Sequence, residues 1–162
     1  MRHEATNNAL RYFREIERGR LRLSMATFHP FALATKDGGQ AFYPHPSGGV
    51  SHSMDRNTKA KNYLWVQTRR LETIMHNLNH TRVDVMNIDI ESTEIYVIPE
   101  ALELWRRCAC KPRLLLIDID AARRQDPEIR KKGRALVQQI LNAGYSLYWD
   151  KYYDMTFIAQ DQ

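Results

Sequence analysis

The sequence of 162 residues predicts an α/β fold with a mostly parallel central sheet. Two apolar stretches, residues 83–91 and 113–120, end in carboxylates, and helical periodicity follows each of them. The order strand, helix, strand, helix is typical of parallel strands joined by crossover helices. Alternating stretches at residues 145–148 and 155–159 predict a terminal antiparallel strand pair that completes the sheet.

The first part of the chain predicts a helix and then strands. An amphipathic helix is expected over residues 6–18, followed by a strand-like stretch over residues 21–34. The helix is indicated by the apolar residues Ala9, Tyr12, Phe13 and Ile16. Residues 36–39 contain Asp-Gly and predict a tight turn, after which residues 40–43 return as a short strand. Residues 44–61 are rich in proline, glycine and serine and predict a loop.

The middle of the chain predicts a short aromatic strand and a helix. Residues 63–67 form the strand, and Thr68 is suited to cap the helix that follows. The helix is expected to bury Leu71, Ile74, Met75 and Leu78.

Caps and breaks predict the bounds of the two later helices. Ser92 or Thr93 is suited to cap the first of them, and Pro99 predicts a break within it. Asp126-Pro127 predicts the start of the second helix, with proline in the first helical position. Gly144 predicts its end.

Acidic residues gather where the two apolar strands end. Side chains alternate along a strand, so Asn87, Asp89 and Glu91 are expected to share one face. Asp118 and Asp120 end the neighbouring strand at the same edge, which is where ligands bind in open α/β sheets. Three readings remain open: the acids cap the following helices, they bind Mg²⁺ or Ca²⁺, or one of them takes a proton from a substrate hydroxyl.

Composition predicts one soluble domain inside the cell, in the cytoplasm or an organelle. The chain is 43% hydrophobic and 27% charged, and no apolar run approaches the roughly 20 residues that span a bilayer. There is no secretory signal, and Cys108 and Cys110 are expected to be reduced thiols. The net charge of +5 leaves nucleic-acid binding open, with the basic clusters more typical of solvated helix faces.

Residues 83–94 resemble the "KIDxEGxE" motif of the FkbM-type methyltransferases, which use S-adenosylmethionine (SAM). Asp89, Glu91 and Glu94 match the acids of that motif. Asn87 stands where the family has lysine, and Ser92 stands where it has glycine.

The resemblance continues along most of the chain. Residues 31–38 resemble the family's "ALSDKDG" turn, and residues 48–53 resemble its small-residue loop. Residues 68–71 match the start of the helix before the motif, and residues 114–120 take the place of a strand that ends in "EIH". This order implies a single partial methyltransferase-like domain over residues 1–162, with a Rossmann-like class I fold truncated at its N-terminus.

The resemblance also implies roles for individual residues. The implied catalytic residues are Asp89, Glu91 and Glu94, and the implied cofactor-binding residues are Ala32, Leu33 and Asp37. No metal ligand is implied.

The family's opening strand and its "DxGxNxG" turn, which hold SAM, have no counterpart in this sequence. We therefore expect SAM not to bind this chain alone. In class I methyltransferases the strand order is 3-2-1-4-5-7-6, so the strand over residues 83–91 is expected to have one bare edge, covered by another protein chain or a second copy. The terminal aromatic residues, Trp149, Tyr152 and Tyr153, are a second expected contact surface.

Two functions follow from these expectations. The chain is either a methyltransferase domain that depends on another chain for SAM, or a degenerate one. As a degenerate domain it would be a non-catalytic subunit of a larger assembly, with RNA as one possible component.

Overall fold

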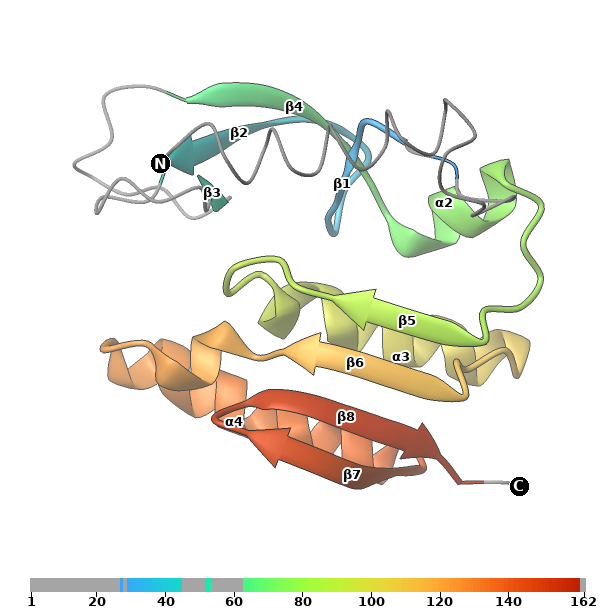
Figure 1. Cartoon of the computed structure of the whole chain (residues 1–162). Coiled ribbons are helices and arrows are strands. Elements are labelled where there is room, and N and C mark those ends of the chain that lie inside the picture. The colour runs from blue at the N-terminus through green and yellow to red at the C-terminus, as the bar shows by residue number, and fades with distance from the viewer. Residues whose placement is uncertain (1–26, 28, 45–51, 54–62, 161–162) are drawn as a thin grey trace, which may run out of the picture.

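A computed structural model describes residues 27, 29–44, 52–53 and 63–160 of the chain (Figure 1). The helix expected over residues 6–18 lies outside the described residues. The described part forms two four-stranded sheets that share no strand pairing with each other.

The first sheet has the strand order β1-β4-β2-β3. Its strands are β1 (Ala32–Leu33), β2 (Gly38–Pro44), β3 (His52–Ser53) and β4 (Leu64–Arg69). β1 pairs with β4 in parallel, and β2 pairs antiparallel with both β3 and β4. The turn expected over residues 36–39 leads into β2, with Gly38 at a φ of 135° that side chains rarely adopt. The strands predicted over residues 40–43 and 63–67 are confirmed. The predicted strand-like stretch over residues 21–34 is only partly described, and in that part β1 is the strand.

The second sheet has the order β5-β6-β8-β7. Its strands are β5 (Val85–Ile88), β6 (Leu114–Asp118), β7 (Tyr145–Lys151) and β8 (Asp154–Ala159). β5 and β6 are adjacent and parallel, and β7 and β8 form an antiparallel pair, as the sequence predicts. The predicted strand over residues 83–91 is shorter than expected, because the chain turns soon after Ile88.

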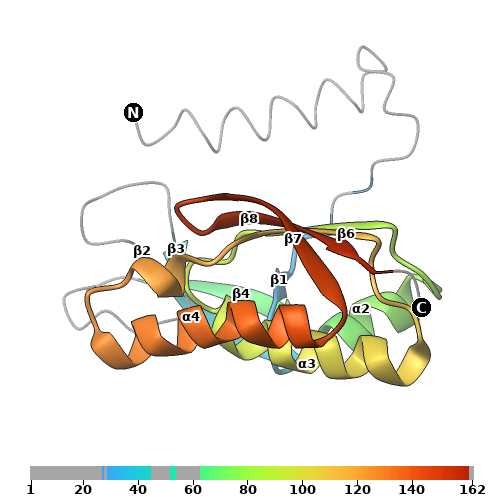
Figure 2. The ribbon, with the colours of Figure 1, turned by 90° about the horizontal axis from the view of Figure 1, so that it is seen from below.

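Two long helices cover one face of the second sheet. Figure 2 shows α3 (Glu94–Cys108) and α4 (Pro127–Asn142) side by side on the same side of that sheet. The predicted cap of α4 is confirmed: Asp126 Oδ1 accepts hydrogen bonds from the backbone N–H groups of Glu128 (2.8 Å) and Ile129 (3.1 Å). A short 3₁₀ helix, η1 (Asp120–Arg123), follows β6. Among the described helices, none combines the length and apolar character needed to cross a membrane.

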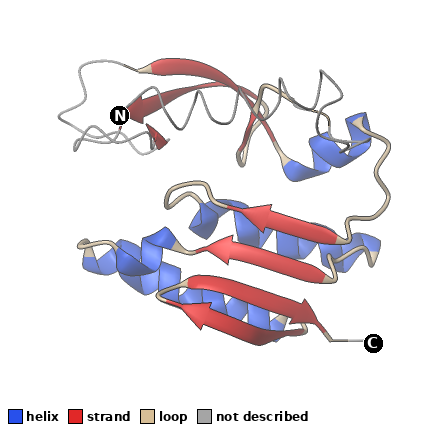
Figure 3. Cartoon of the chain, in the orientation of Figure 1, coloured by secondary structure: helices blue, strands red, loops and turns tan. Residues whose placement is uncertain are grey.

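The expectation of a mostly parallel sheet is wrong. Among the strands that the structure describes, β1 with β4 and β5 with β6 are parallel, and the other pairs are antiparallel (Figure 3). β7 and β8 are joined by a tight turn, and a connection this short can only return the chain antiparallel. The order of helices and strands is consistent with the expected class I fold, but each sheet contains both parallel and antiparallel strand pairs.

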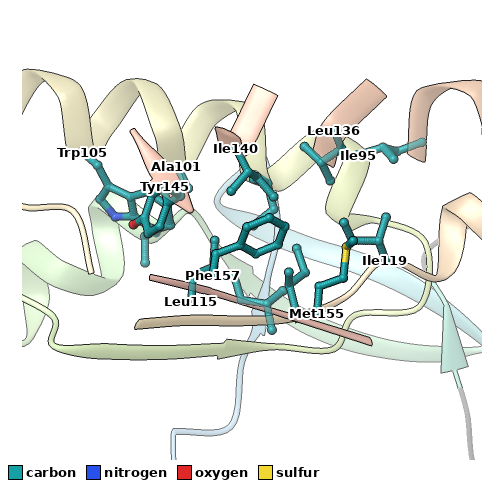
Figure 4. Close-up of a cluster of buried hydrophobic side chains, with 14 of the residues drawn as sticks. Ile95, Ala101, Trp105, Leu115, Ile119, Leu136, Ile140, Tyr145, Met155 and Phe157 are labelled. Atoms are coloured by element: carbon teal, nitrogen blue, oxygen red, sulfur yellow. The ribbon is translucent and has the colours of Figure 1, made fainter. Parts of the chain in front are cut away.

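The core lies between the second sheet and its two helices (Figure 4). Leu115 and Phe157 point from the sheet toward Ile140 on α4, and none of these three side chains has exposed surface. The helix α4 also packs closely against η1. A Cβ on Gly133 of α4 would lie 2.3 Å from the backbone nitrogen of Ala122 in η1. This contact fixes η1, which carries Asp120, against α4.

Three local expectations are wrong. Pro99 lies inside a continuous α3, because Ile98 and Ala101 on either side of it are both anchored in the core. Thr68 belongs to β4 and caps no helix. The helix α2 (Leu71–Asn77) begins after Arg70 and takes its cap from Asp37, far away in the sequence.

Cys108 and Cys110 are joined by a disulfide, so the expectation of reduced thiols is also wrong. Ala109 between them is the C-cap of α3 and adopts a left-handed conformation with a φ of 49°. That conformation turns the chain back on itself at the helix end and brings the two cysteines together.

Candidate functional site

The acidic residues predicted from the sequence do meet at one edge of the second sheet. β5 and β6 are parallel, so their carboxyl ends lie side by side, followed by the turn into α3 and by η1. Asp89, Asp118 and Asp120 are contributed by these ends. The pKa of Asp89 responds to the charges of both Asp118 and Asp120, which places the three carboxylates in one electrostatic environment.

The turn after β5 has an unusual backbone. Glu91 and Ser92 have φ values of 54° and 76°, in the left-handed region that favours glycine. Ser92 occupies the position at which the resembled motif has its glycine. Glu91 therefore lies in a turn, and Asp89 directly follows the end of β5. The expectation that Asn87, Asp89 and Glu91 share one strand face is wrong, because only Asn87 lies in the strand.

Glu94 holds this turn closed from inside. Its side chain is completely buried, and Oε1 accepts hydrogen bonds from the backbone N–H groups of Ser92 (3.0 Å) and Ile90 (3.2 Å). Its other oxygen, Oε2, has no hydrogen-bond partner in the described structure. Burial raises the pKa of Glu94 to about 7, so the carboxyl takes up a proton near neutral pH. Its contacts make Glu94 a residue that shapes the turn.

Ser92 is also tied to the residues that follow β6. Its Oγ donates a hydrogen bond to Asp120 Oδ2 (2.7 Å) and accepts one from Arg124 Nε (2.5 Å). Arg124 Nη2 lies 2.9 Å from the same Asp120 oxygen. A glycine at position 92 could make neither of the Oγ contacts, so the serine adds a link between the two turns.

Arg123 joins the end of β6 to the tip of the β7–β8 hairpin. Its Nη2 donates to Asp118 Oδ1 (2.5 Å) and lies 3.5 Å from Asp120 Oδ1. Its Nη1 donates to the backbone carbonyl of Tyr152 (2.8 Å). The hydrogen bond to Asp118 is the main cause that raises the pKa of Arg123, which stays protonated. Asp118 and Asp120 are thus compensated by arginines.

Asp89 differs from these acids because it is exposed. Its pKa is raised first by partial burial of the carboxyl group and then by the charges of Asp118, Glu91 and Asp120. A carboxylate with a raised pKa at the end of a strand is suited to accept a proton from a hydroxyl group. Within the described residues, no three His, Cys, Asp or Glu side chains are arranged to hold a metal ion.

The residues predicted to bind the cofactor lie elsewhere. Ala32 and Leu33 form β1 of the first sheet and are half-buried. Asp37 Oδ1 accepts from the backbone N–H of Arg70 (2.9 Å) and Oδ2 from Thr73 Oγ1 (2.7 Å), so both oxygens are engaged at the start of α2. These bonds lower the pKa of Asp37. Cofactor binding by these three residues stays a prediction.

Sequence reasoning missed the two arginines of the site. The sequence predicts that basic clusters such as Arg123-Arg124 form solvated helix faces. Their spacing of three and four residues after Asp120 is the available signal, because arginine forms strong charge-assisted hydrogen bonds with a carboxylate.

β5 is the last strand of its sheet, so no glycine-rich turn follows a strand on its outer side in the part of the chain that the structure describes. A hollow of about 370 Å³ does adjoin β5, but it is lined by Asp84, Val85, Arg113, Leu114, Ile158 and Ala159, at the opposite end of the strands from the acids.

Comparisons with known proteins place these features in a family. No curated protein and no solved structure matches the chain. The family model for the methyltransferase FkbM domain matches residues 7–147, which is most of the chain. The matched residues include the acids at the ends of β5 and β6. The chain belongs to the FkbM methyltransferase family.

Proposed function

We propose that this chain is an FkbM-type methyltransferase domain that contributes the acidic side of the site and depends on another polypeptide to bind SAM. The observation that carries the proposal is the carboxyl end of β5, where Asp89 is exposed while the neighbouring acids are held by Arg123 and Arg124. SAM would supply the methyl group. Asp89 would orient a hydroxyl group of the acceptor and remove its proton.

The other residues of the site hold Asp89 in place. Glu94 closes the turn beyond it, and Arg123 fixes the adjoining ends of β6 and the β7–β8 hairpin. Positioning of this kind lets a carboxylate meet a hydroxyl without reorganisation of the site.

A second function is favoured by one specific observation. Ser92 in place of glycine links Asp120 and Arg124 across the acidic edge. Such a closed network supports a degenerate domain retained as a non-catalytic subunit of a larger assembly.

Calorimetric titration with SAM tests the dependence on another polypeptide. We expect no binding at micromolar SAM, because the described residues provide no glycine-rich turn beside β5. A micromolar Kd for the chain alone would overturn this part of the proposal.

Methyl transfer from radiolabelled SAM to hydroxyl-bearing acceptors, at millimolar SAM, separates the two functions. We expect slow transfer that Asp89→Asn abolishes and that the control Glu128→Gln, at an exposed position on α4, retains. Transfer that Asp89→Asn leaves unchanged would contradict the proposed role of Asp89.

A further inference from the structure

The end of α3 joins two cysteines that lie in different surroundings. Cys108 is the last residue of the helix and is exposed, whereas Cys110 is only 7% exposed and belongs to the hydrophobic core. A disulfide connects them. Exchange of a disulfide begins when a thiolate reaches one of its two sulfur atoms. The difference in exposure therefore makes the Cys108 side of this bond the point of attack.

The chain beyond the disulfide is held by hydrogen bonds that do not involve sulfur. The backbone N–H of Cys110 donates to the carbonyl of Trp105 (3.3 Å). Two residues further on, the carbonyl of Pro112 accepts a hydrogen bond from Tyr145 Oη (2.9 Å), and both of these residues are buried. The Cα atoms of Cys108 and Cys110 are 5.1 Å apart. Because Cys110 is anchored in this way, opening the disulfide leaves two thiols that can rejoin.

The reduced state also has a partner for the exposed cysteine. Cys108 Sγ lies 4.0 Å from the carbonyl oxygen of Trp105. A sulfur atom in a disulfide carries no proton, but a thiol at the same place would donate a weak hydrogen bond to this oxygen. The end of α3 therefore accommodates both the disulfide and the dithiol.

The disulfide is a poor staple for the fold. Ala109 is the only residue between the two cysteines. The stabilisation that a disulfide gains from restricting the unfolded chain grows with the number of residues in the loop that it closes, and this loop is minimal. Exposed disulfides are, in contrast, typical of labile and catalytic sites. The spacing and the exposure together favour a bond that opens and closes.

We propose that Cys108 and Cys110 form a thiol–disulfide exchange site whose substrates are small free thiols. The thiolate of such a compound attacks Cys108 Sγ and forms a mixed disulfide, while the bond to Cys110 breaks and Cys110 leaves as a thiolate. A second molecule of the thiol then attacks the outer sulfur of the mixed disulfide and releases Cys108 as a thiolate. Both cysteines take up from water the protons that the two thiols lost to it. Two external thiols are thereby oxidised to a disulfide, and the protein disulfide is reduced. This reaction is separate from methyl transfer and does not rest on it.

Two matched variants test which sulfur reacts, and the products are readily assigned because the chain contains no other cysteine. Cys110→Ser leaves only the Cys108 thiol, and Cys108→Ser leaves only the Cys110 thiol. Each variant is incubated with oxidised glutathione, and the glutathione adduct is followed by intact-mass spectrometry. We expect the Cys108 thiol to react about tenfold or more faster than the Cys110 thiol in native buffer, and the two to react equally in urea, since reactivity follows exposure. Equal rates in native buffer would overturn the assignment of Cys108.

The wild-type chain tests exchange directly, without a variant and without SAM. After incubation with oxidised glutathione the chain should contain no free thiol. We then expect reduced glutathione to open the bond at a rate that stays constant with urea below the unfolding transition, and the circular dichroism spectrum to stay unchanged, because the exposed site reacts without unfolding. A rate that rises with urea, loss of the folded spectrum on reduction, free thiols that persist in oxidised glutathione, or opening by reduced thioredoxin but not by glutathione would overturn the proposal.

Discussion

At the scale of single residues, the completely buried carboxyl of Glu94 connects the stability of the site to pH. Burial raises its pKa from 4.5 to about 7 in the folded chain. Between these values the folded state holds a proton that the unfolded state releases. This contribution to stability is therefore fully present below about pH 4.5 and is lost as the pH rises through about 7.

Glu94→Gln should remove this pH dependence because the amide does not titrate. We expect the fall in the free energy of unfolding between pH 4.5 and about 7.5 to be smaller in the variant by up to about 3 kcal/mol. Urea denaturation at several pH values measures it. The exposed Glu128→Gln serves as the control, and a Glu94→Gln variant that keeps the wild-type slope would contradict the assigned burial.

Ser92 allows the left-handed turn to be tested separately from its side-chain contacts. Ser92→Gly and Ser92→Ala both lose the hydrogen bonds to Asp120 and Arg124, but only glycine accepts a φ of 76° without strain. We expect the glycine variant to be more stable than the alanine variant by about 1 kcal/mol. Equal unfolding free energies in urea would rule out the left-handed turn.

At the scale of elements, the sequence predicts those whose signals are local. The α4 helix follows from Asp126-Pro127 and Gly144, because caps act within a few residues. The parallel pairing of β5 and β6 follows from their order along the chain. The cap that Asp37 provides for α2 and the tie between Arg123 and Tyr152 could not be predicted, because both join residues far apart in the sequence.

The burial of one face of β5 gives an element-scale prediction. Ile88 is buried against the helices, so Ile88→Asp would place an unpaired charge in the core and should destabilise the chain by about 3 kcal/mol or more. Asn87→Asp is the matched control, since the next residue back on the same strand points to the opposite, exposed face. Thermal and urea denaturation compare the two, and similar stabilities would contradict the assigned strand faces.

At the scale of the whole molecule, the arrangement of two sheets was only partly predictable. The resemblance implies a bare edge for the strand over residues 83–91, and β5 is a terminal strand of its sheet in the described structure. The antiparallel pairing of β2 with β4 was not foreseen, because residues 45–63 separate these strands and carry no short hairpin signal.

An open strand edge should make the purified chain associate as its concentration rises. We expect polydisperse association at tens of micromolar in sedimentation velocity runs, reduced by Val85→Lys, since a lysine on an edge strand opposes further pairing. Gln139→Lys on the exposed side of α4 adds the same charge and should not reduce it. A monodisperse wild-type chain would show that the edge does not drive association.

The three tryptophans lie in settings different enough to act as separate optical reporters. Trp105 is 2% exposed and packs 6.4 Å from the ring of Tyr145, Trp65 is 67% exposed and covers Gly39, and Trp149 is 44% exposed on β7. Trp105 should emit at the shortest wavelength and resist quenching by iodide, and Trp65 should be the most readily quenched. The double substitution Trp65→Phe and Trp149→Phe would remove the two exposed tryptophans, one from each sheet. The remaining fluorescence would come from Trp105 and would follow the core alone.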